Sequence, residues 1–196
     1  MTLGELLARI GEYLDRAGIP YMVTGSIASS FYGEPRTTRD LDIVIDPTPE
    51  ALSEFVQGLP EGDYYVDPDA AAQALADRWQ FNVIEIASGW KVDLVIRRDR
   101  PFSVEEFSRR QATELLGTPT FVATAEDTII AKLEWAKAGE SERQLRDVAA
   151  ILAVSGDTLD HAYLDRWIEA LGLQDVWSQV GPRRHLPPHA SDISPP

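Results

Sequence analysis

The first hydrophobic residues of the chain have the spacing of a helix, and the next ones have the spacing of a strand. Residues 21–24 are rich in β-prone side chains and end at Gly25-Ser26, and residues 27–32 have a short helical pattern. A strand, a Gly-Ser turn and a helix are therefore predicted in that order. An amphipathic helix should precede them, since apolar residues recur at helical intervals before a stop at Gly18 and Pro20: Leu3, Leu6, Leu7, Ile10 and Leu14.

Apolar and mostly polar residues alternate over residues 40–46, which is the period of a strand with one buried face. Asp40 and Asp42 therefore project from the same face of the predicted strand. Further along, residues 81–86 and 90–96 are β-prone and are joined by a Ser-Gly turn, which predicts a hairpin. Its second arm could lie beside the strand at 40–46.

Helical patterns account for most of the remaining chain. Ser103 with Glu106, and Thr124 with Asp127, have the spacing of capping boxes at helix starts. Strands give way to helices near Thr124, so we predict a core over residues 1–123, a helical part over 124–180 and a disordered proline-rich tail over 181–196. The other predicted elements are a small strand over 64–66 and helices starting at 48–49, over 69–79, over 141–154 and, once or twice, over 164–180.

Composition narrows the class of protein. The 196 residues suit one domain, or a catalytic domain with a small appended part, and no apolar run approaches the roughly 20 residues needed to span a bilayer. No secretory signal is evident, so a cytoplasmic protein without membrane contact is expected. The absence of cysteine excludes thiolate metal sites. A formal charge of −14 repels nucleic acid at long range and leaves polynucleotide binding to a local basic patch or to metal ions.

Carboxylates supply the candidate chemistry. The side chains of Asp40 and Asp42 leave the strand about 7 Å apart, which suits two ligands of a shared cation, and all-oxygen ligands favour magnesium or manganese. Taken alone, such a pair is more often solvated or capping. Asp93, in the second hairpin arm, is a third carboxylate whose alternative is an edge or rim position. Gly25 and Ser26 open a helix and could offer amides and a hydroxyl to a phosphate, or form a plain turn.

Together these residues resemble the signature of the DNA polymerase beta-like nucleotidyltransferase superfamily: Gly25, Ser26, Asp40, Asp42 and Asp93. The resemblance implies an α+β fold with a palm-like mixed sheet flanked by helices and followed by a small C-terminal helical part. It also implies an enzyme that moves a nucleoside monophosphate from an NTP to an acceptor hydroxyl and releases pyrophosphate. The three aspartates would be catalytic residues and ligands of Mg²⁺ or Mn²⁺.

Within that superfamily, residues 25–46 resemble the minimal nucleotidyltransferases of the AbiEii and MenT type, which are toxins of toxin-antitoxin and phage-defence systems. Residues 125–152 resemble their lysine motif, followed by a helix with Arg-Asp. The likeness adds Lys132 as a catalytic residue and brings Arg146 and Asp147 to the site, with Asp147 on the nucleotide. It implies tRNA as the acceptor and a cognate antitoxin as a partner.

Alternatives stay open for the basic residues and for the function. Arg36 and Arg39 could clamp phosphates, or they could balance Asp40 and Glu34. Lys132 could be solvated, and the Arg146-Asp147 pair could belong to ion pairs along its helix. A small hydroxylated acceptor such as an aminoglycoside fits the negative charge better than RNA does. A nucleotide-binding module without catalysis is the third possibility.

Overall fold

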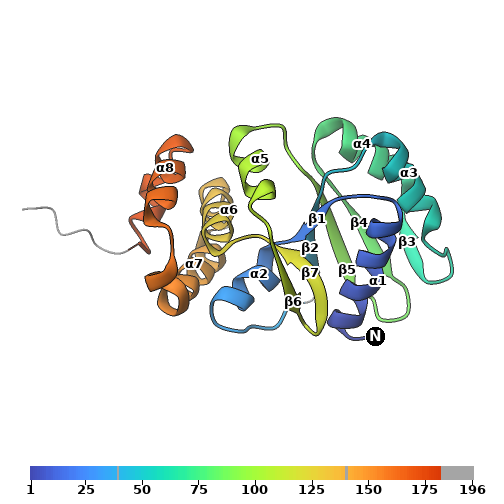
Figure 1. The fold of residues 1–196 in the computed structure, drawn as a ribbon, viewed down its shortest axis with the longest axis horizontal. Coiled ribbons are helices and arrows are strands. Elements are labelled where there is room, and N and C mark those ends of the chain that lie inside the picture. The colour runs from blue at the N-terminus through green and yellow to red at the C-terminus, as the bar shows by residue number, and fades with distance from the viewer. Residues whose placement is uncertain (39, 140, 182–196) are drawn as a thin grey trace, which may run out of the picture.

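The computed structural model describes residues 1–38, 40–139 and 141–181. Within these ranges one mixed sheet of seven strands has the order β3-β4-β5-β2-β1-β7-β6. Helices cover the sheet, and a helical group lies at one end (Figure 1). The predicted fold class is thereby confirmed. The strands are β1 (Tyr21–Val23), β2 (Asp40–Ile45), β3 (Tyr64–Val66), β4 (Gln80–Glu85), β5 (Lys91–Ile96), β6 (Gln111–Leu115) and β7 (Thr118–Val122).

The helices follow the predicted order closely. The helix predicted at the start of the chain is α1. For residues 164–180 one or two helices were predicted, and the structure has two, α8 and α9. A helix that the resemblance places after the lysine motif is α7. The bounds are α1 (Leu3–Arg16), α2 (Gly25–Tyr32), α3 (Pro49–Gly58), α4 (Pro68–Asp77), α5 (Pro101–Ser108), α6 (Ala125–Ala138), α7 (Ser141–Ser155), α8 (His161–Ala170) and α9 (Gln174–Trp177).

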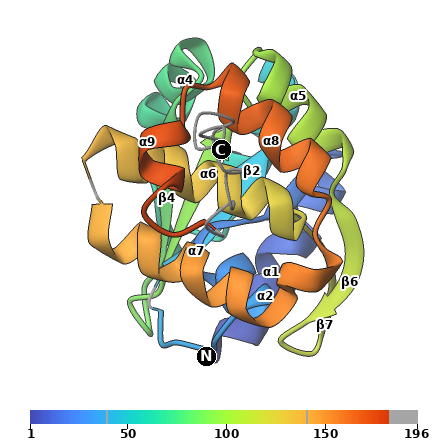
Figure 2. The same cartoon turned by 90° about the vertical axis from the view of Figure 1, so that its left-hand side faces the viewer.

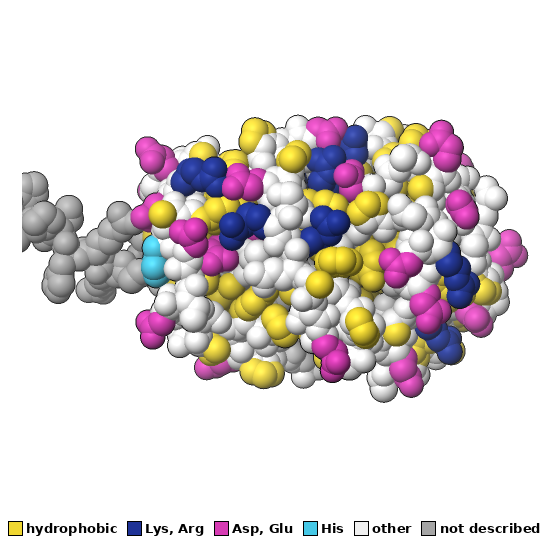
Figure 3. Space-filling model, viewed as in Figure 1, with side chains coloured by type: hydrophobic (Ala, Val, Ile, Leu, Met, Phe, Trp, Pro, Cys, Tyr) yellow, Lys and Arg dark blue, Asp and Glu magenta, His cyan; other side chains and the backbone are white. Residues whose placement is uncertain are grey.

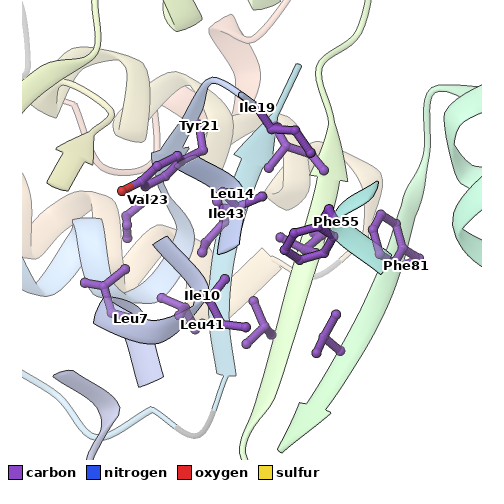
Figure 4. Packing of buried hydrophobic residues seen from close by; sticks show 14 of the residues in the cluster. Leu7, Ile10, Leu14, Ile19, Tyr21, Val23, Leu41, Ile43, Phe55 and Phe81 are labelled. Atoms are coloured by element: carbon purple, nitrogen blue, oxygen red, sulfur yellow. The ribbon is translucent and has the colours of Figure 1, made fainter. Parts of the chain in front are cut away.

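The main core lies on one face of the sheet. Leu41 and Ile43 of β2 point into it and are fully buried against α1 and α3, as Figure 4 shows for Ile10, Leu14 and Phe55. Burying large aliphatic and aromatic side chains stabilises a fold by about 1.5–3 kcal/mol each. The alternation in β2 follows from this packing, because the residues between the core positions must face the other side.

A second core holds the C-terminal helices together. Ile129 and Leu133 of α6 pack with Val148 and Ile151 of α7 and with Trp167 of α8. Figure 2 shows α6 to α9 as the layer nearest the viewer. Because α6 and α7 also contact α2, this layer faces the side of the sheet that carries Asp40 and Asp42.

Two capping predictions had different outcomes. Thr124 caps α6: its hydroxyl accepts a hydrogen bond from the Asp127 amide at 3.2 Å and donates one to the Asp127 carboxylate at 2.7 Å. The capping box at Ser103 and Glu106 was wrong. Pro101 occupies the first turn and starts α5 earlier, with Arg100 as N-cap, so Ser103 and Glu106 lie inside the helix.

The strands β6 and β7 were not predicted, whereas the hairpin of β4 and β5 was, with Gly89 in its turn at a φ of 71°. Residues 182–196 of the predicted tail lie outside the described residues, and the boundary at 123/124 stays a prediction. Across the described ranges no helix is long and apolar enough to cross a membrane.

Candidate functional site

The pairing of β2 with β5 brings the three predicted carboxylates onto one face. The strands are parallel, and their register sets Asp42 beside Asp93 and Asp40 beside Lys91. Asp93 is only 8% exposed, and β5 lies between β4 and β2. The edge or rim position considered for Asp93 was therefore wrong.

Gly25 lies directly against Asp42. Its φ of 63° is in the left-handed region, and a Cβ atom built on it would come within 2.0 Å of Asp42 Oδ2. The Ser26 amide donates a hydrogen bond of 3.3 Å to the same oxygen. Only glycine allows this approach without displacing the carboxylate, so the Gly-Ser turn fixes the position of Asp42.

The charges around these carboxylates are not balanced evenly. Burial raises the pKa of Asp42, and the neighbouring Asp93 and Asp40 add to the rise, while the Ser26 amide and Lys132 oppose it. The Lys91 ammonium lies 2.9 Å from Asp93 Oδ2 and 3.7 Å from Asp40 Oδ1. Its hydrogen bond to Asp93 raises the pKa of Lys91 despite partial burial. The Lys91 ammonium therefore bridges two of the three carboxylates, those of Asp40 and Asp93.

The donor set fits a divalent cation in part. Asp93 Oδ1 is buried and has no hydrogen-bond partner among the described residues, and three carboxylates are the ligands that magnesium prefers. In the part of the chain that the structure describes, no three His, Asp or Glu side chains are grouped closely enough to hold a metal ion as they stand. A metal ion would have to displace the Lys91 ammonium from Asp93 and Asp40.

A buried ionic network lies beside the carboxylates. Asp147 on α7 accepts two hydrogen bonds of 3.0 Å from Arg36 and one of 2.8 Å from the Lys132 ammonium. Arg36 also donates to the Ser26 hydroxyl at 2.6 Å. Lys132 and Asp147 are about 95% buried, with 5% and 6% of their surface exposed. The network ties α2, α6 and α7 together next to Asp42.

Lys132 and Asp147 shift each other's pKa. Burial lowers the pKa of Lys132, although its hydrogen bond to Asp147 opposes the shift. Burial alone would raise the pKa of Asp147, but the hydrogen bonds from Arg36 and Lys132 outweigh it and hold that pKa below its ordinary value. Asp147 is therefore ionised at neutral pH and balances two basic groups.

Several alternatives for the basic residues were wrong. Lys132 is not solvated, and Arg36 pairs with Asp147 rather than with Asp40 or Glu34. Arg146 does not join the site: it is exposed and pairs with Glu142 one turn earlier on α7. Arg39 lies outside the described residues.

Arg143 is a candidate that the sequence analysis missed. It lines a cavity of about 310 Å³ together with Asp40, Asp42, Asp93 and Lys132, and its guanidinium donates to the Ser26 hydroxyl at 3.3 Å. Arg143 lies four residues before Asp147, so the two share one face of α7. That spacing is the signal that could have found it. We name this space the carboxylate cavity; its other lining residues are Thr24, Gly25, Ser26, Gln80, Val95, Thr128, Ala131, Trp135 and Gln144.

A second cavity, of about 380 Å³, adjoins the first between the sheet, α5 and α6. Both cavities are lined by Thr24, Val95, Ala131 and Trp135, so they lie next to each other. Glu106 of α5 also lines the second cavity and is 7% exposed. Burial, helped by the charge of Asp127, raises the pKa of Glu106 to about 8.

Stability should therefore depend on Glu106. The folded protein keeps a proton on Glu106 that the unfolded chain loses near its ordinary value of 4.5, so this contribution is complete below pH 4.5 and is lost as the pH rises towards 8. At about 1.4 kcal/mol per pKa unit, the loss amounts to several kcal/mol. We expect urea unfolding of Glu106→Gln to show a flatter decline with pH than wild type.

Glu105→Gln is the matched control, because Glu105 is on the same helix but pairs with Arg166 outside the cavity. It should keep the wild-type decline between pH 5 and 8. Equal slopes for Glu106→Gln and wild type would show that Glu106 is ionised in the folded protein.

Structural comparison identifies the fold, although no family model and no curated protein matches the sequence. ANT(2'')-Ia in complex with adenylyl-2''-tobramycin superposes with a TM-score of 0.59 at 13% identity, over 89% of this chain and 99% of that one. The fold is that of a nucleotidyltransferase. The lincosamide antibiotic adenylyltransferase LnuA, with lincomycin bound, gives a TM-score of 0.55 at 12% identity, over 79% of this chain and 98% of that one.

A third neighbour with the nucleotidyltransferase fold is an antigenic nucleotidyltransferase-like protein from Paracoccidioides brasiliensis. It has a TM-score of 0.55 and 15% identity, and the match covers 91% of each chain. The coverage is nearly complete in both directions, so the likeness includes the C-terminal helices as well as the sheet. Identities this low establish the fold and leave the reaction to be inferred from the site.

Proposed function

We propose that this protein is a nucleotidyltransferase that moves a nucleoside monophosphate from an NTP to an acceptor hydroxyl. The observation that carries the proposal is the register of β2 and β5, which places Asp42 beside Asp93 under the Gly25-Ser26 turn. A cluster of three carboxylates in which burial raises the pKa of Asp42, lined by basic side chains, suits a phosphate chain that arrives with divalent cations.

Each residue of the site has a role in this proposal. Asp40, Asp42 and Asp93 hold Mg²⁺ or Mn²⁺, which when bound neutralises charge on the phosphates. The acceptor oxygen forms a bond to the α-phosphorus, the bond to the β-phosphate oxygen breaks, and pyrophosphate leaves. Asp93, with its unpartnered Oδ1, receives the proton of the acceptor hydroxyl.

Basic groups and the Gly-Ser turn would hold the triphosphate. Gly25 and Ser26, at the start of α2, line the carboxylate cavity, and a helix start offers amides to a phosphate. Lys132 and Arg143 line the same space and supply positive charge where the transition state gathers negative charge. Arg36, and the Asp147 that it binds, set the positions of Ser26 and Lys132.

A small hydroxylated molecule is the acceptor that we favour. The chain has 18 basic and 32 acidic residues, a balance that disfavours long polyanions. Two structures of the same fold contain bound small molecules: ANT(2'')-Ia is in complex with adenylyl-2''-tobramycin, and LnuA has lincomycin bound. The carboxylate cavity and the second cavity measure about 310 and 380 Å³, and small-molecule sites measure roughly 300–1,000 Å³.

A toxin that modifies tRNA in the cytoplasm, held in check by an antitoxin, is the second candidate. It is favoured by the contact between Lys132 and Asp147, the residues that the resemblance to AbiEii and MenT toxins assigns to one site. Both candidates use the same nucleotidyl transfer and differ only in the acceptor.

Labelled NTPs distinguish these functions. Purified protein is incubated with Mg²⁺ and each α-labelled NTP, with total cellular RNA in one arm and with amine-bearing or neutral hydroxylated small molecules in another. We expect label on a small molecule, and none with a chelator or with Asp42→Asn. Label on RNA alone would establish the tRNA candidate. Metal-dependent NTP binding without transfer to any acceptor would refute the enzyme and leave a binding module.

Arg143 provides a test of the triphosphate site. Arg143→Ala removes a guanidinium from the carboxylate cavity and should raise the KM for NTP by about tenfold to a hundredfold, because a charge-assisted contact contributes about 1.5–3 kcal/mol. Arg146→Ala, on the exposed side of the same helix, should leave KM unchanged. Steady-state kinetics with varied NTP measure both. An equal effect of the two substitutions would place the triphosphate elsewhere.

A further inference from the structure

The second cavity, which we name the α5 cavity, lies where an acceptor would meet the carboxylates. On β2, Asp42 lines the carboxylate cavity and Val44, two residues further on, lines the α5 cavity. On β5, Asp93 lines the carboxylate cavity and Val95 lines both. One step of two residues along a strand covers about 7 Å. A molecule in the α5 cavity could therefore reach the Asp93 carboxylate with a hydroxyl while its other end remains near α5.

The arginines of the α5 cavity are mostly neutralised by carboxylates. Arg100 forms two hydrogen bonds of 2.6 Å with Glu134. Arg97 pairs with Asp46 at 2.9 Å and with Asp99 at 3.2 Å. In Figure 3, dark blue and magenta side chains likewise lie next to each other over the upper middle of the molecule. The cavity therefore does not attract anions as strongly as its three arginines would suggest.

Aromatic side chains form the rim of the cavity. Trp79 and Trp135 line it and are 50% and 44% exposed. The Arg98 guanidinium lies 5.4 Å from the centre of the Trp79 ring, and Trp135 lines both cavities. Indole faces attract cations.

Glu106 is the unusual group inside the α5 cavity. It is more than nine-tenths buried, and none of the described residues donates a hydrogen bond to its carboxyl group. Asp127 and Glu134 add like charge around it, which the Arg100 guanidinium partly offsets. A carboxyl group in such surroundings is costly to ionise. A ligand that brings a positive charge and hydrogen-bond donors would remove that cost.

We propose that the α5 cavity is the acceptor site and that it takes a small hydroxylated molecule by a protonated amine, which binds Glu106. On binding, Glu106 releases its proton to solvent and the ligand ammonium donates to the resulting carboxylate, so one proton leaves for each amine bound. A neighbouring hydroxyl of the ligand then points towards Asp93. This inference rests on the proposed nucleotidyl transfer and adds the chemical class of the acceptor.

Calorimetric binding of tobramycin, without NTP or metal, tests the proposal at slightly acidic pH, where its amines are protonated. Fully N-acetylated tobramycin, which keeps the hydroxyls and loses the charges, is the matched ligand. We expect wild type to bind tobramycin at least tenfold more tightly than the acetylated form, a difference of about 1.4 kcal/mol. Glu106→Gln should lose that preference, and Glu105→Gln should keep it.

Proton release gives a readout that a loss of packing would not change. In buffers of different ionisation enthalpy, wild type should release about one proton more per bound tobramycin than Glu106→Gln does. Glutamine has the shape of the neutral carboxyl group, so the variant should fold. Equal affinity for the two ligands, or equal affinity and proton release in wild type and Glu106→Gln, would overturn the proposal.

The outcome is separate from that of the transfer assay. If tobramycin bound wild type no more tightly than Glu106→Gln while RNA became labelled in the transfer assay, the amine site would be rejected and nucleotidyl transfer would stand. Absence of transfer to every acceptor would instead reject the proposed reaction.

Discussion

Replacing Gly25 with alanine is expected to abolish nucleotidyl transfer, whereas the same change at Gly18 should leave the activity intact. Both glycines have a left-handed backbone, with φ of 63° and 65°. Alanine at such a position costs about 1–2 kcal/mol. The added methyl group at Gly25 would meet Asp42 Oδ2 at 2.0 Å and Asp42 Cγ at 2.5 Å, while at Gly18 it meets nothing within 4 Å.

The comparison isolates the contact with Asp42 from backbone strain. Urea unfolding should show a loss of about 1–2 kcal/mol from strain in each variant, with any further loss at Gly25 coming from the clash, and the labelled-NTP assay should show transfer only for Gly18→Ala. A methyl group that pushes the Asp42 carboxylate by an ångström is enough to misplace a reacting group. Full activity in a folded Gly25→Ala protein would mean that Asp42 does not need its present position.

Residue patterns predicted the parts of the site that depend on local periodicity. The two-residue period of β2 was enough to place Asp40 and Asp42 on one face, since the opposite face is buried under α1 and α3. The strands β6 and β7 were missed because β6 is an edge strand with mostly exposed side chains and β7 contains Pro119, so neither has a clear alternation.

Contacts between distant segments could not be predicted in the same way. Lys91 meets Asp40 only through the register of β2 against β5, and a slip of two residues would keep every side chain on its face. Arg143 reaches Ser26 because α7 crosses α2. Glu106 was assigned to a helix cap because its spacing from Ser103 fits one, and only the earlier start of α5 at Pro101 turns it into the cavity.

Replacing Asp147 with asparagine is expected to lower the free energy of unfolding by about 3–5 kcal/mol, the range for breaking a buried ion pair. The change removes the carboxylate that pairs with both Lys132 and Arg36 and leaves these two basic groups next to each other, with Lys132 almost fully buried. Glu142 is on the same helix and its carboxylate pairs with Arg146, but both side chains of this pair are exposed. Glu142→Gln should therefore cause no measurable change in urea unfolding.

A double substitution separates the structural role of this network from its role in the reaction. Lys132→Met with Asp147→Leu removes the buried pair and leaves Arg36, whose side chain is 27% exposed, with its hydrogen bond to Ser26. Replacing a buried pair by apolar residues is often neutral or stabilising. We expect much of the lost stability to return, while nucleotidyl transfer stays at least a hundredfold below wild type because the carboxylate cavity has lost the Lys132 ammonium. If activity returned along with stability, Lys132 and Asp147 would serve only to join α6 and α7, and the phosphate charge would have to be balanced by Arg143 and the metal ligands alone.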